Sequence, residues 1–469
     1  MVVPWGTEEL RPVSVGVAVT TSGCGMSRGA PRGGAGDVLS DLEGRLPELR
    51  ALYEDLHRNP ELSGQERRTA AIVADRFAAA GLTTTPGVGG TGVVGLLRNG
   101  DGPVVMVRGD MDALPIAERT GLPYASTASG ALPDGSATPV MHACGHDVHT
   151  VALIGSVEAL ARARDTWSGT LLAVAQPAEE TAEGALALLA DGLFTRFPKP
   201  DVAVGQHVQA LPVGLVAHSP DVLMSAATNV EIRIFGRGGH GSFPEAAVDP
   251  VVVAAFLVVR LQTIVSRELA PAEPAVVTVG ALHAGSRANV IPDEARLSVN
   301  VRVRSDATRD RVVAAIRRIA DAETRAARCP REPEITLSAR FPLTRNDSAL
   351  DGLIRATHEE FLGEGSVITI DPVMGSEDFA YYGLPGPGRY EGAPVPYSFW
   401  FFGGTLRETW DETPGAGLAK LGALPGPHTA TFAPDPDGSL ATGVRALVSA
   451  VLASLASEEG APPGHPRQD

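Results

Sequence analysis

The amino-acid sequence predicts an α/β protein, in which a mostly parallel sheet is covered by helices on both faces and a smaller domain is inserted into the larger one. Its 469 residues exceed what one hydrophobic core normally supports. Apolar strand segments alternate with helical segments through the first half of the chain. After about residue 221 the order becomes strand, helix, strand, strand, helix, strand, which is the ferredoxin-like order βαββαβ.

The larger domain is predicted from alternating segments. Ser63 and Glu66 stand at capping-box spacing ahead of a helix expected over residues 65–80. Further helices are expected at 149–163 and 183–190. Strands are expected at 91–97, 104–108, 169–175 and 202–204. Strands and helices that alternate at these lengths favour a parallel sheet buried on both faces.

The inserted domain is predicted between residues 222 and 340. Its strands are expected at 228–235, 275–282, 295–303 and 334–340, and its helices at 249–267 and 307–327. The α/β pattern then resumes with helices at 347–362 and 438–455 and strands at 366–370 and 398–402. We therefore expect five parts: a disordered extension (1–37), the first part of the larger domain (38–221), the inserted domain (222–340), the second part of the larger domain (341–456) and a flexible tail (457–469).

Composition narrows the class of partner. A formal net charge of -16 opposes binding to nucleic acid and to anionic membrane surfaces, and no clustered Lys/Arg stripe overrides it. No run of eighteen apolar residues is present, so no membrane span is expected. Cys24, Cys144 and Cys329 are too few for a disulfide framework, which favours a reducing, cytoplasmic compartment. A small-molecule substrate is the favoured partner.

The densest chemical signal lies between His142 and His149, where three histidines, Cys144 and Asp147 fall within eight residues. Buried without a metal, so many polar side chains would leave unsatisfied groups, and thiolate and imidazole are good ligands for Zn-like ions. The pattern therefore predicts a metal site. A cysteine nucleophile activated by histidine is the alternative.

Two acidic pairs follow predicted strands. Glu179 and Glu180 come directly after the strand at 169–175, where α/β sheets open their sites, so one could bind an ion while the other accepts a proton from water. A solvated helix N-terminus is the plainer interpretation of the pair. Asp110 and Asp112, after the strand at 104–108, fit either a turn in which an Asp caps a helix or a carboxylate that orients a ligand. His207 and His428 are ambiguous by themselves.

Five motifs together resemble one known family. They are residues 141–149 (MHACGHDVH), 176–180 (QPAEE), 236–244 (GRGGHGSFP), 289–293 (NVIPD) and 374–381 (MGSEDFAY). In order and spacing, from about residue 39 to 455, the chain resembles the aminoacylase and carboxypeptidase G family of co-catalytic metallohydrolases. The resemblance is to its amidohydrolase branch, with hippurate hydrolases, indole-acetyl-amino-acid hydrolases and N-acyl-L-amino acid amidohydrolases.

The resemblance implies a site with two divalent ions, zinc or manganese, with cobalt as a further candidate. It makes Glu179 the general base. It implies metal ligands at Cys144, His146, Glu180, His207 and His428, with the Cys144 thiolate bridging the ions, and carboxylates at Asp110 and Asp147 that orient the ligands. Arg108 stands where the wider family has a metal-binding histidine.

The inserted domain would act as a lid. The resemblance implies that His240 reaches the oxyanion of the reaction, in many members across a dimer interface, and that Asn289 and Arg302 hold the free carboxylate of the substrate. Hinges are expected at Ser219-Pro220 and Phe341-Pro342. A homodimer or larger homo-oligomer through the lid would follow from this role.

The implied activity is hydrolysis of the amide bond of N-acyl amino acids by a metal-bridged hydroxide. A dipeptidase or metallocarboxypeptidase of the same architecture is the alternative, and a metal-binding scaffold without activity is a rival from another class. Residues 130–140 form a longer stretch than usual for the family, which borders the expected site and bears on substrate choice.

Overall fold

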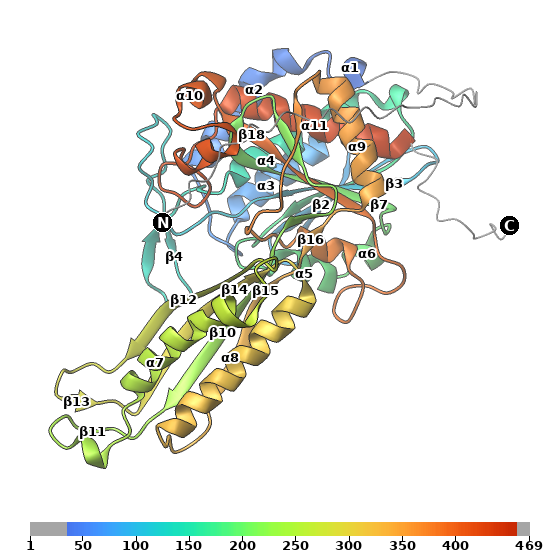
Figure 1. The fold of residues 1–469 in the computed structure, drawn as a ribbon. Helices are drawn as coiled ribbons and strands as arrows, with labels where there is room; N and C mark the ends of the chain where they lie inside the picture. The colour runs from blue at the N-terminus through green and yellow to red at the C-terminus, as the bar shows by residue number, and fades with distance from the viewer. Residues whose placement is uncertain (1–34, 457–469) are drawn as a thin grey trace, which may run out of the picture.

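The computed structural model describes residues 35–456, which form a large α/β domain and an elongated smaller domain that projects from it (Figure 1). The predicted tail (457–469) and residues 1–34 of the predicted extension lie outside the described residues. Residues 35–37, also expected in the extension, instead begin helix α1 (Ala35–Val38).

The large sheet has eight strands in the order β1-β2-β6-β3-β7-β18-β8-β17. Its centre, from β6 through β3 and β7 to β18, is parallel, whereas β1 and β2 form an antiparallel edge and β8 runs antiparallel to β18. The strands are β1 (Thr83–Val88), β2 (Gly92–Asn99), β3 (Val104–Asp110), β6 (Gly169–Gln176), β7 (Val202–Pro212), β8 (Val216–His218), β17 (Val367–Thr369) and β18 (Tyr397–Thr405). Every residue of β6 is buried, as expected for a strand covered on both faces.

Helices cover both faces of this sheet, so the predicted fold class is confirmed. One face packs against α2 (Leu42–Arg58), α3 (Arg67–Ala79), α4 (His146–Arg162), α9 (Ser348–Leu362) and α11 (Pro436–Ala456). The other packs against α5 (Gly184–Ala190), α6 (Leu193–Arg196) and the 3-10 helix η4 (Phe379–Gly383). Shorter elements are α10 (Arg407–Glu412), η1 (Arg164–Thr166), η2 (Pro244–Ala246), the π-helical turn η3 (Ile264–Glu268) and η5 (Gly417–Gly422).

The predicted capping box before α3 is wrong. The Ser63 hydroxyl donates to Asp112 at 2.6 Å, and Glu66 makes no side-chain cap. The Glu61 carboxylate instead accepts from the backbone amides of Arg68 and Thr69, at 2.9 and 2.8 Å. The first-turn amides are therefore satisfied by a residue further upstream, which frees Ser63 and Glu66 for contacts toward the sheet.

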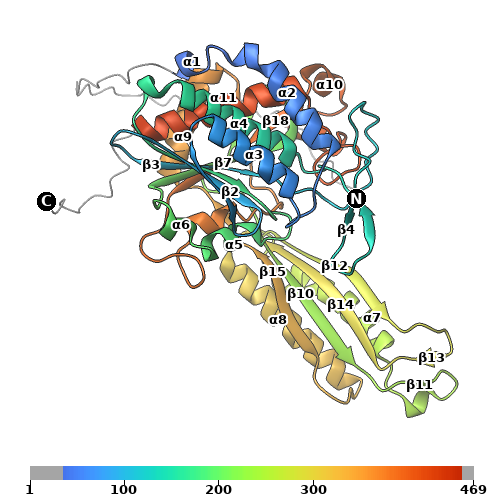
Figure 2. The ribbon, with the colours of Figure 1, turned by 180° about the vertical axis from the view of Figure 1, so that it is seen from behind.

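The smaller domain, called the lid below, comprises residues 226–341. Its antiparallel sheet has the order β12-β14-β10-β15, and α7 and α8 cover one face. The elements are β10 (Ala226–Phe235), α7 (Pro250–Thr263), β12 (Ala275–Ala284), β14 (Glu294–Val303), α8 (Asp306–Ala326) and β15 (Glu334–Phe341), which is the predicted βαββαβ order. A two-stranded ribbon of β11 (Gly239–His240) and β13 (Val290–Ile291) forms the far tip (Figures 1 and 2).

The two chain crossings between the domains lie side by side. Strand β9 (Val222–Met224) pairs with β16 (Thr344–Arg345). The Asn346 amide donates to the carbonyls of Ser219, at 3.1 Å, and Phe399, at 2.9 Å. Both crossings are thus fixed to the large domain at one place, from which the lid extends.

Two further features bear on the sequence predictions. Residues 129–139 form a hairpin of β4 (Ser129–Ala131) and β5 (Ala137–Pro139). Two helical segments, 250–268 and 436–456, have the length and hydropathy of a membrane span, contrary to expectation. In α11 72% of the apolar window is buried, as in a core helix, against 33% in the segment that contains α7.

Candidate metal centre

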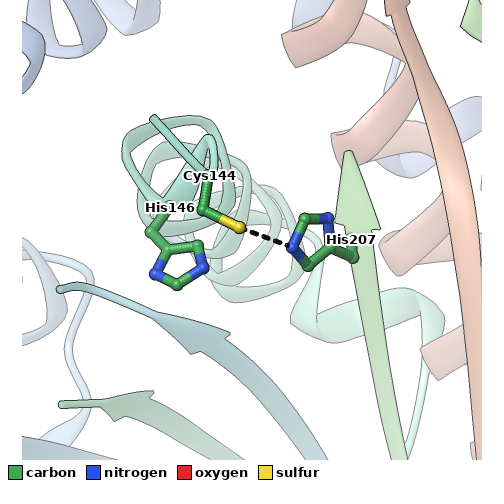
Figure 3. A group of neighbouring side chains, drawn as sticks. All are labelled: Cys144, His146 and His207. Carbon is green, nitrogen blue, oxygen red and sulfur yellow. Dashed lines mark hydrogen bonds between the residues drawn. The ribbon is translucent and has the colours of Figure 1, made fainter. Parts of the chain in front are cut away.

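The centre is organised by the start of α4. The helix begins at His146, three residues earlier than predicted, directly after Gly145, whose φ is +80°. A Cβ at Gly145 would also lie 2.4 Å from Val208 Cγ1, so both the backbone conformation and the space require glycine here. This turn directs Cys144 and His146 toward His207 on β7 (Figure 3).

Three sets of potential ligands converge on this point. Cys144 Sγ lies 3.3 Å from His207 Nε2 (Figure 3). Within each set the ligand atoms lie within 4.8 Å of one another: Cys144 with His146 and His207, Cys144 with Glu180 and His428, and His146 with Glu179 and Glu180. Cys144, His146 and Glu180 each belong to two of these three sets, so the sets overlap and could together hold more than one ion.

His428 completes the second set from a distant loop. Its Nε2 lies 3.2 Å from Glu180 Oε1, and its backbone amide donates to the Ala143 carbonyl at 2.7 Å. The residue has φ +68°, which is uncommon for a side chain other than glycine, and 56% of its side chain is exposed. The hydrogen bond to Ala143 therefore holds His428 at the mouth of the centre.

The donor atoms fit a pair of divalent cations. His146 Nε2 is buried without a hydrogen-bond partner among the described residues, and Glu180 Oε1, although 3.2 Å from His428 Nε2, makes no hydrogen bond of good geometry there. Burial and the carboxylates of Glu180 and Glu179 raise the pKa of the Cys144 thiol well above its usual range, so the thiolate needs a cation beside it. Sulfur, imidazole nitrogen and carboxylate oxygen together form the donor set of Zn-like ions.

Buried partners fix the orientation of both imidazoles. His146 Nδ1 contacts Asp112 Oδ1 at 3.1 Å, which leaves Nε2 directed at the centre. His207 Nδ1 donates to the Val208 carbonyl at 2.6 Å, so its Nε2 faces the thiol. Such outer contacts set the tautomer of a ligating histidine.

The two predicted orienting carboxylates are not equivalent. Asp110 contacts His149 Nδ1 at 2.6 Å and lies 3.8 Å from His146 Nε2, so it borders the centre. Asp147, in contrast, contacts none of the predicted ligands. Its carboxylate binds His57 Nδ1 at 2.7 Å, on the other side of α4, and is therefore corrected to a contact between helices.

Glu179 lies in the centre's most acidic region. It is 5% exposed, and burial together with the neighbouring carboxylates of Glu377 and Glu180 raises its pKa well above its usual range. Arg108, fully buried, pairs with Glu377 at 2.8 Å and Asp378 at 3.1 Å. The guanidinium therefore partly neutralises Glu377 and Asp378, which we call the acidic wall of the centre.

A family model for Peptidase family M20/M25/M40 matches residues 106–406. The chain belongs to this family. A hippurate hydrolase from Campylobacter jejuni is 37% identical over 349 residues, which cover 73% of this chain and 86% of the relative. An N-acetyl-L-cysteine deacetylase from Bacillus subtilis is 36% identical over 79% of this chain and 83% of its own length. A dinuclear metal-binding peptidase of the M20 family from Bacillus subtilis is similar in structure, with a TM-score of 0.67 and 27% identity over 88% of this chain and 99% of its own.

The structure does not bring all the predicted site residues of this M20 family chain together. His240 and Asn289 lie at the far tip of the lid, in and beside the β11–β13 ribbon (Figures 1 and 2). Arg302 lies at the other end of β14, where Nη1 donates to the Met374 carbonyl at 2.8 Å. The expectation that Asn289 and Arg302 hold one carboxylate is therefore wrong for a single chain, because β14 separates them.

Four residues of this M20 family site were not among the predicted site residues, although Asp112 and His149 belong to segments that the sequence singled out. Asp112 orients His146, and its other oxygen accepts from the Glu180 amide at 3.0 Å. His149 Nε2 accepts from the Val208 amide at 2.8 Å, beside His207. Glu377 and Asp378 form the acidic wall, and both stand in the motif 374–381, which was recognised without a role for either.

Proposed function

We propose that this chain hydrolyses the amide bond of N-acyl amino acids, as an M20 amidohydrolase with two divalent ions. The observation that carries the proposal is the overlap of three ligand sets through Cys144, His146 and Glu180, one of which contains the buried Glu179. Relatives named as a hippurate hydrolase, an N-acetyl-L-cysteine deacetylase and an IAA-amino acid hydrolase support the substrate class.

Cys144, His146, Glu180, His207 and His428 would hold the two ions, which supply an acidified water and a polarised substrate carbonyl. Zinc or manganese is the proposed metal, with cobalt as a further candidate, because the donors combine thiolate and imidazole with carboxylate. A thiol ligand also needs a reducing environment, which supports our proposal of a cytoplasmic location.

Glu179 moves the proton in this proposal. Its raised pKa suits a carboxylate that accepts a proton from water and later delivers it to the leaving amine. Glu180 is the proposed ligand instead, because its Oε1 lies 3.2 Å from His428 Nε2, a second proposed ligand. Burial and the neighbouring carboxylates of Glu377, Glu180 and Asp378 raise the pKa of Glu179 because they disfavour its charged form.

Arg302 is the proposed partner of the substrate's free carboxylate. It is half-buried on the polar face of the lid sheet, and Nε donates to Asn300 while Nη1 donates to Met374. Nη2 has no partner among the described residues, so this nitrogen of the guanidinium is available to a carboxylate. Met374 lies three residues before Glu377, so the Arg302 guanidinium lies where the lid meets the large domain, near the centre.

His240 and Asn289 are proposed to serve the metal centre of a second copy of the chain in a homodimer. Both lie at the far tip of the lid, away from their own centre (Figure 2). A stripe of exposed apolar side chains on α7 supports lid-to-lid contact, with Val252 50%, Phe256 63% and Val259 69% exposed. These positions recur at helical spacing, so they form one continuous face.

The direct test is a hydrolysis screen with the purified, metal-loaded protein. Hippurate, N-acetyl-cysteine and indole-acetyl amino acids are offered with and without a chelator, and amine release is measured. We expect activity that the chelator abolishes and zinc, manganese or cobalt restores. Cys144→Ser should lose metal and activity, whereas Cys329→Ser, the other free cysteine of the described chain, should keep both.

Two outcomes would contradict this function. Full activity in the thoroughly chelated protein would exclude the metal route. A trapped acyl adduct on Cys144, seen by mass spectrometry, would move the enzyme to the nucleophilic cysteine class.

A further inference from the structure

A groove runs along the lid edge formed by β15, on the sheet face that the helices cover. Strand β15 is an edge strand, and α8 leaves part of it open, so that 51% of Leu337 is exposed. The groove has a volume of about 520 Å³, and its walls include Thr228, Arg309, Asp310, Val313, Arg317, Leu337 and Arg340. This size falls in the range of roughly 300–1,000 Å³ that small-molecule sites occupy.

Three guanidinium groups line this groove in a strongly acidic protein. Arg309 pairs with Asp306 and, at 2.9 Å, with Asp310, both on its own helix. Arg317 and Arg340 have no carboxylate within 4.0 Å in the part of the chain that the structure describes. With a net charge of -16 overall, carboxylates are abundant, so two unpaired arginines in one groove leave local positive charge available to a ligand.

The buried hydroxyl of Thr228, which lines the same groove, is a second observation that does not depend on charge. Thr228 is 2% exposed, and its Oγ1 has no hydrogen-bond partner among the described residues. It stands on β10 in the alternation that includes Val230 and Ile232, so it faces α8, and it pairs across the sheet with Arg340. A buried hydroxyl without a partner costs free energy, which an oxygen of a bound molecule would recover.

We propose that this groove binds a small organic carboxylate with an apolar body. The carboxylate would lie between Arg317 and Arg340 and contact the Thr228 hydroxyl, while the apolar body would cover Val313 and Leu337. A carboxylic acid released by the proposed amide hydrolysis belongs to this class, and in that respect alone the inference rests on the proposed function.

The groove is separate from the metal centre. Arg302 serves the opposite, polar face of the lid sheet, whereas the groove lies on the helix-covered face. Arg340 is the residue before Phe341, where the lid ends, and its carbonyl accepts a hydrogen bond from the Tyr381 hydroxyl of the large domain. An occupant would therefore contact the lid at the point where it joins the large domain.

The test is calorimetric titration of the metal-loaded protein with benzoate, with neutral benzamide as the ligand control. The double variant Arg317→Gln/Arg340→Gln should lose one benzoate site per chain, and Arg317→Gln alone should weaken that site about tenfold or more, as expected for a lost charge-assisted hydrogen bond. Arg318→Gln is the matched control, because Arg318 is on the same helix but pairs with Glu268. Thr228→Val should weaken benzoate binding while preserving the fold, since the replacement is close in shape.

Equal benzoate stoichiometry and affinity in the wild type and the double variant would overturn the proposal. Displacement of benzoate from this site by inorganic phosphate at similar concentration would overturn the organic carboxylate as its ligand. Because the readout is binding, and the same variants can be assayed for hippurate hydrolysis, failure of the groove and failure of the proposed function give different results.

Discussion

Two variants that are each inactive should restore activity when their chains exchange in a dimer. His240→Ala removes the lid histidine, and Glu179→Gln removes the proposed base. In the mixed dimer one metal centre would lack both groups. The other would retain its own Glu179 and receive His240 from the lid of its partner, so that centre should work.

The geometry of the lid sets the expected size of this effect. Arg302 contacts the large domain, and the ribbon with His240 lies beyond Glu294 at the other end of β14. The eight residue steps between Arg302 and Glu294 span about 26 Å at the usual rise of a strand, so His240 cannot reach its own centre. With equal mixing, half of the dimers are mixed and each has one intact centre, which predicts about a quarter of wild-type activity for a symmetric dimer.

The assay mixes the two purified variants, allows subunit exchange and follows hippurate hydrolysis. Differently tagged chains confirm by co-purification that mixed dimers have formed. A mixture of Glu179→Gln with Cys144→Ser is the matched control, because both changes fall in the metal centre and no mixed dimer has an intact one. No gain of activity over this control, with exchange confirmed, would refute the placement of His240 in the partner's site.

Two further predictions concern the site, and a third concerns the buried His57 outside it. Glu179→Gln should retain both ions by metal analysis while kcat falls by about 10²–10⁴-fold; loss of metal would reassign Glu179 as a ligand. Arg302→Ala should raise KM for substrates with a free carboxylate, by an amount that corresponds to about 2 kcal/mol of lost binding free energy. This is the low end of the loss expected for truncating one partner of a buried charge pair, because Arg302 is half-exposed. An equal rise in KM for amidated substrates would contradict its role. Burial lowers the pKa of His57, but hydrogen bonds to Asp147 and Glu118 raise it from 6.5 to about 9. Since the folded pKa is the higher one, this stabilisation, on the order of 3 kcal/mol, is complete below pH 6.5 and is lost as pH rises through 9. Urea unfolding at several pH values should show that the free energy of unfolding of His57→Gln no longer falls between pH 6.5 and 9. If the variant and the wild type lose stability equally over this range, the role of His57 is disproved.

Regular patterns made most of the fold predictable. The strand and helix periods identified the centre of the large sheet and all six main elements of the lid. Helix α2 was missed, since Pro47 inside it normally counts against a helix. Strand β7 was expected to end at Val204 but continues to Pro212, because Gly205 weakens the strand signal while the neighbouring strands supply the pairing.

The error at Asp147 has a geometric cause. The resemblance implied an orienting role for Asp147, and the helix was expected to begin only at residue 149, beyond it. Because α4 begins at His146, the two residues are consecutive in a helix and cannot face each other. Asp147 therefore points to His57, and Asp112, which follows β3, takes the position beside His146.

Charge balance connects the buried network to the proposed pair of ions. Arg108 is the buried guanidinium of this region, and it meets Asp110, Glu377 and Asp378 at once. The buried carboxyl groups around the centre are Asp110, Asp112, Glu179, Glu377 and Asp378. The raised pKa values of Glu179 and Asp378, which burial and neighbouring carboxylates cause, indicate that one guanidinium does not compensate them. Divalent cations at Cys144 would supply the missing positive charge, so the ions would complete the interior of the large domain as well as its chemistry.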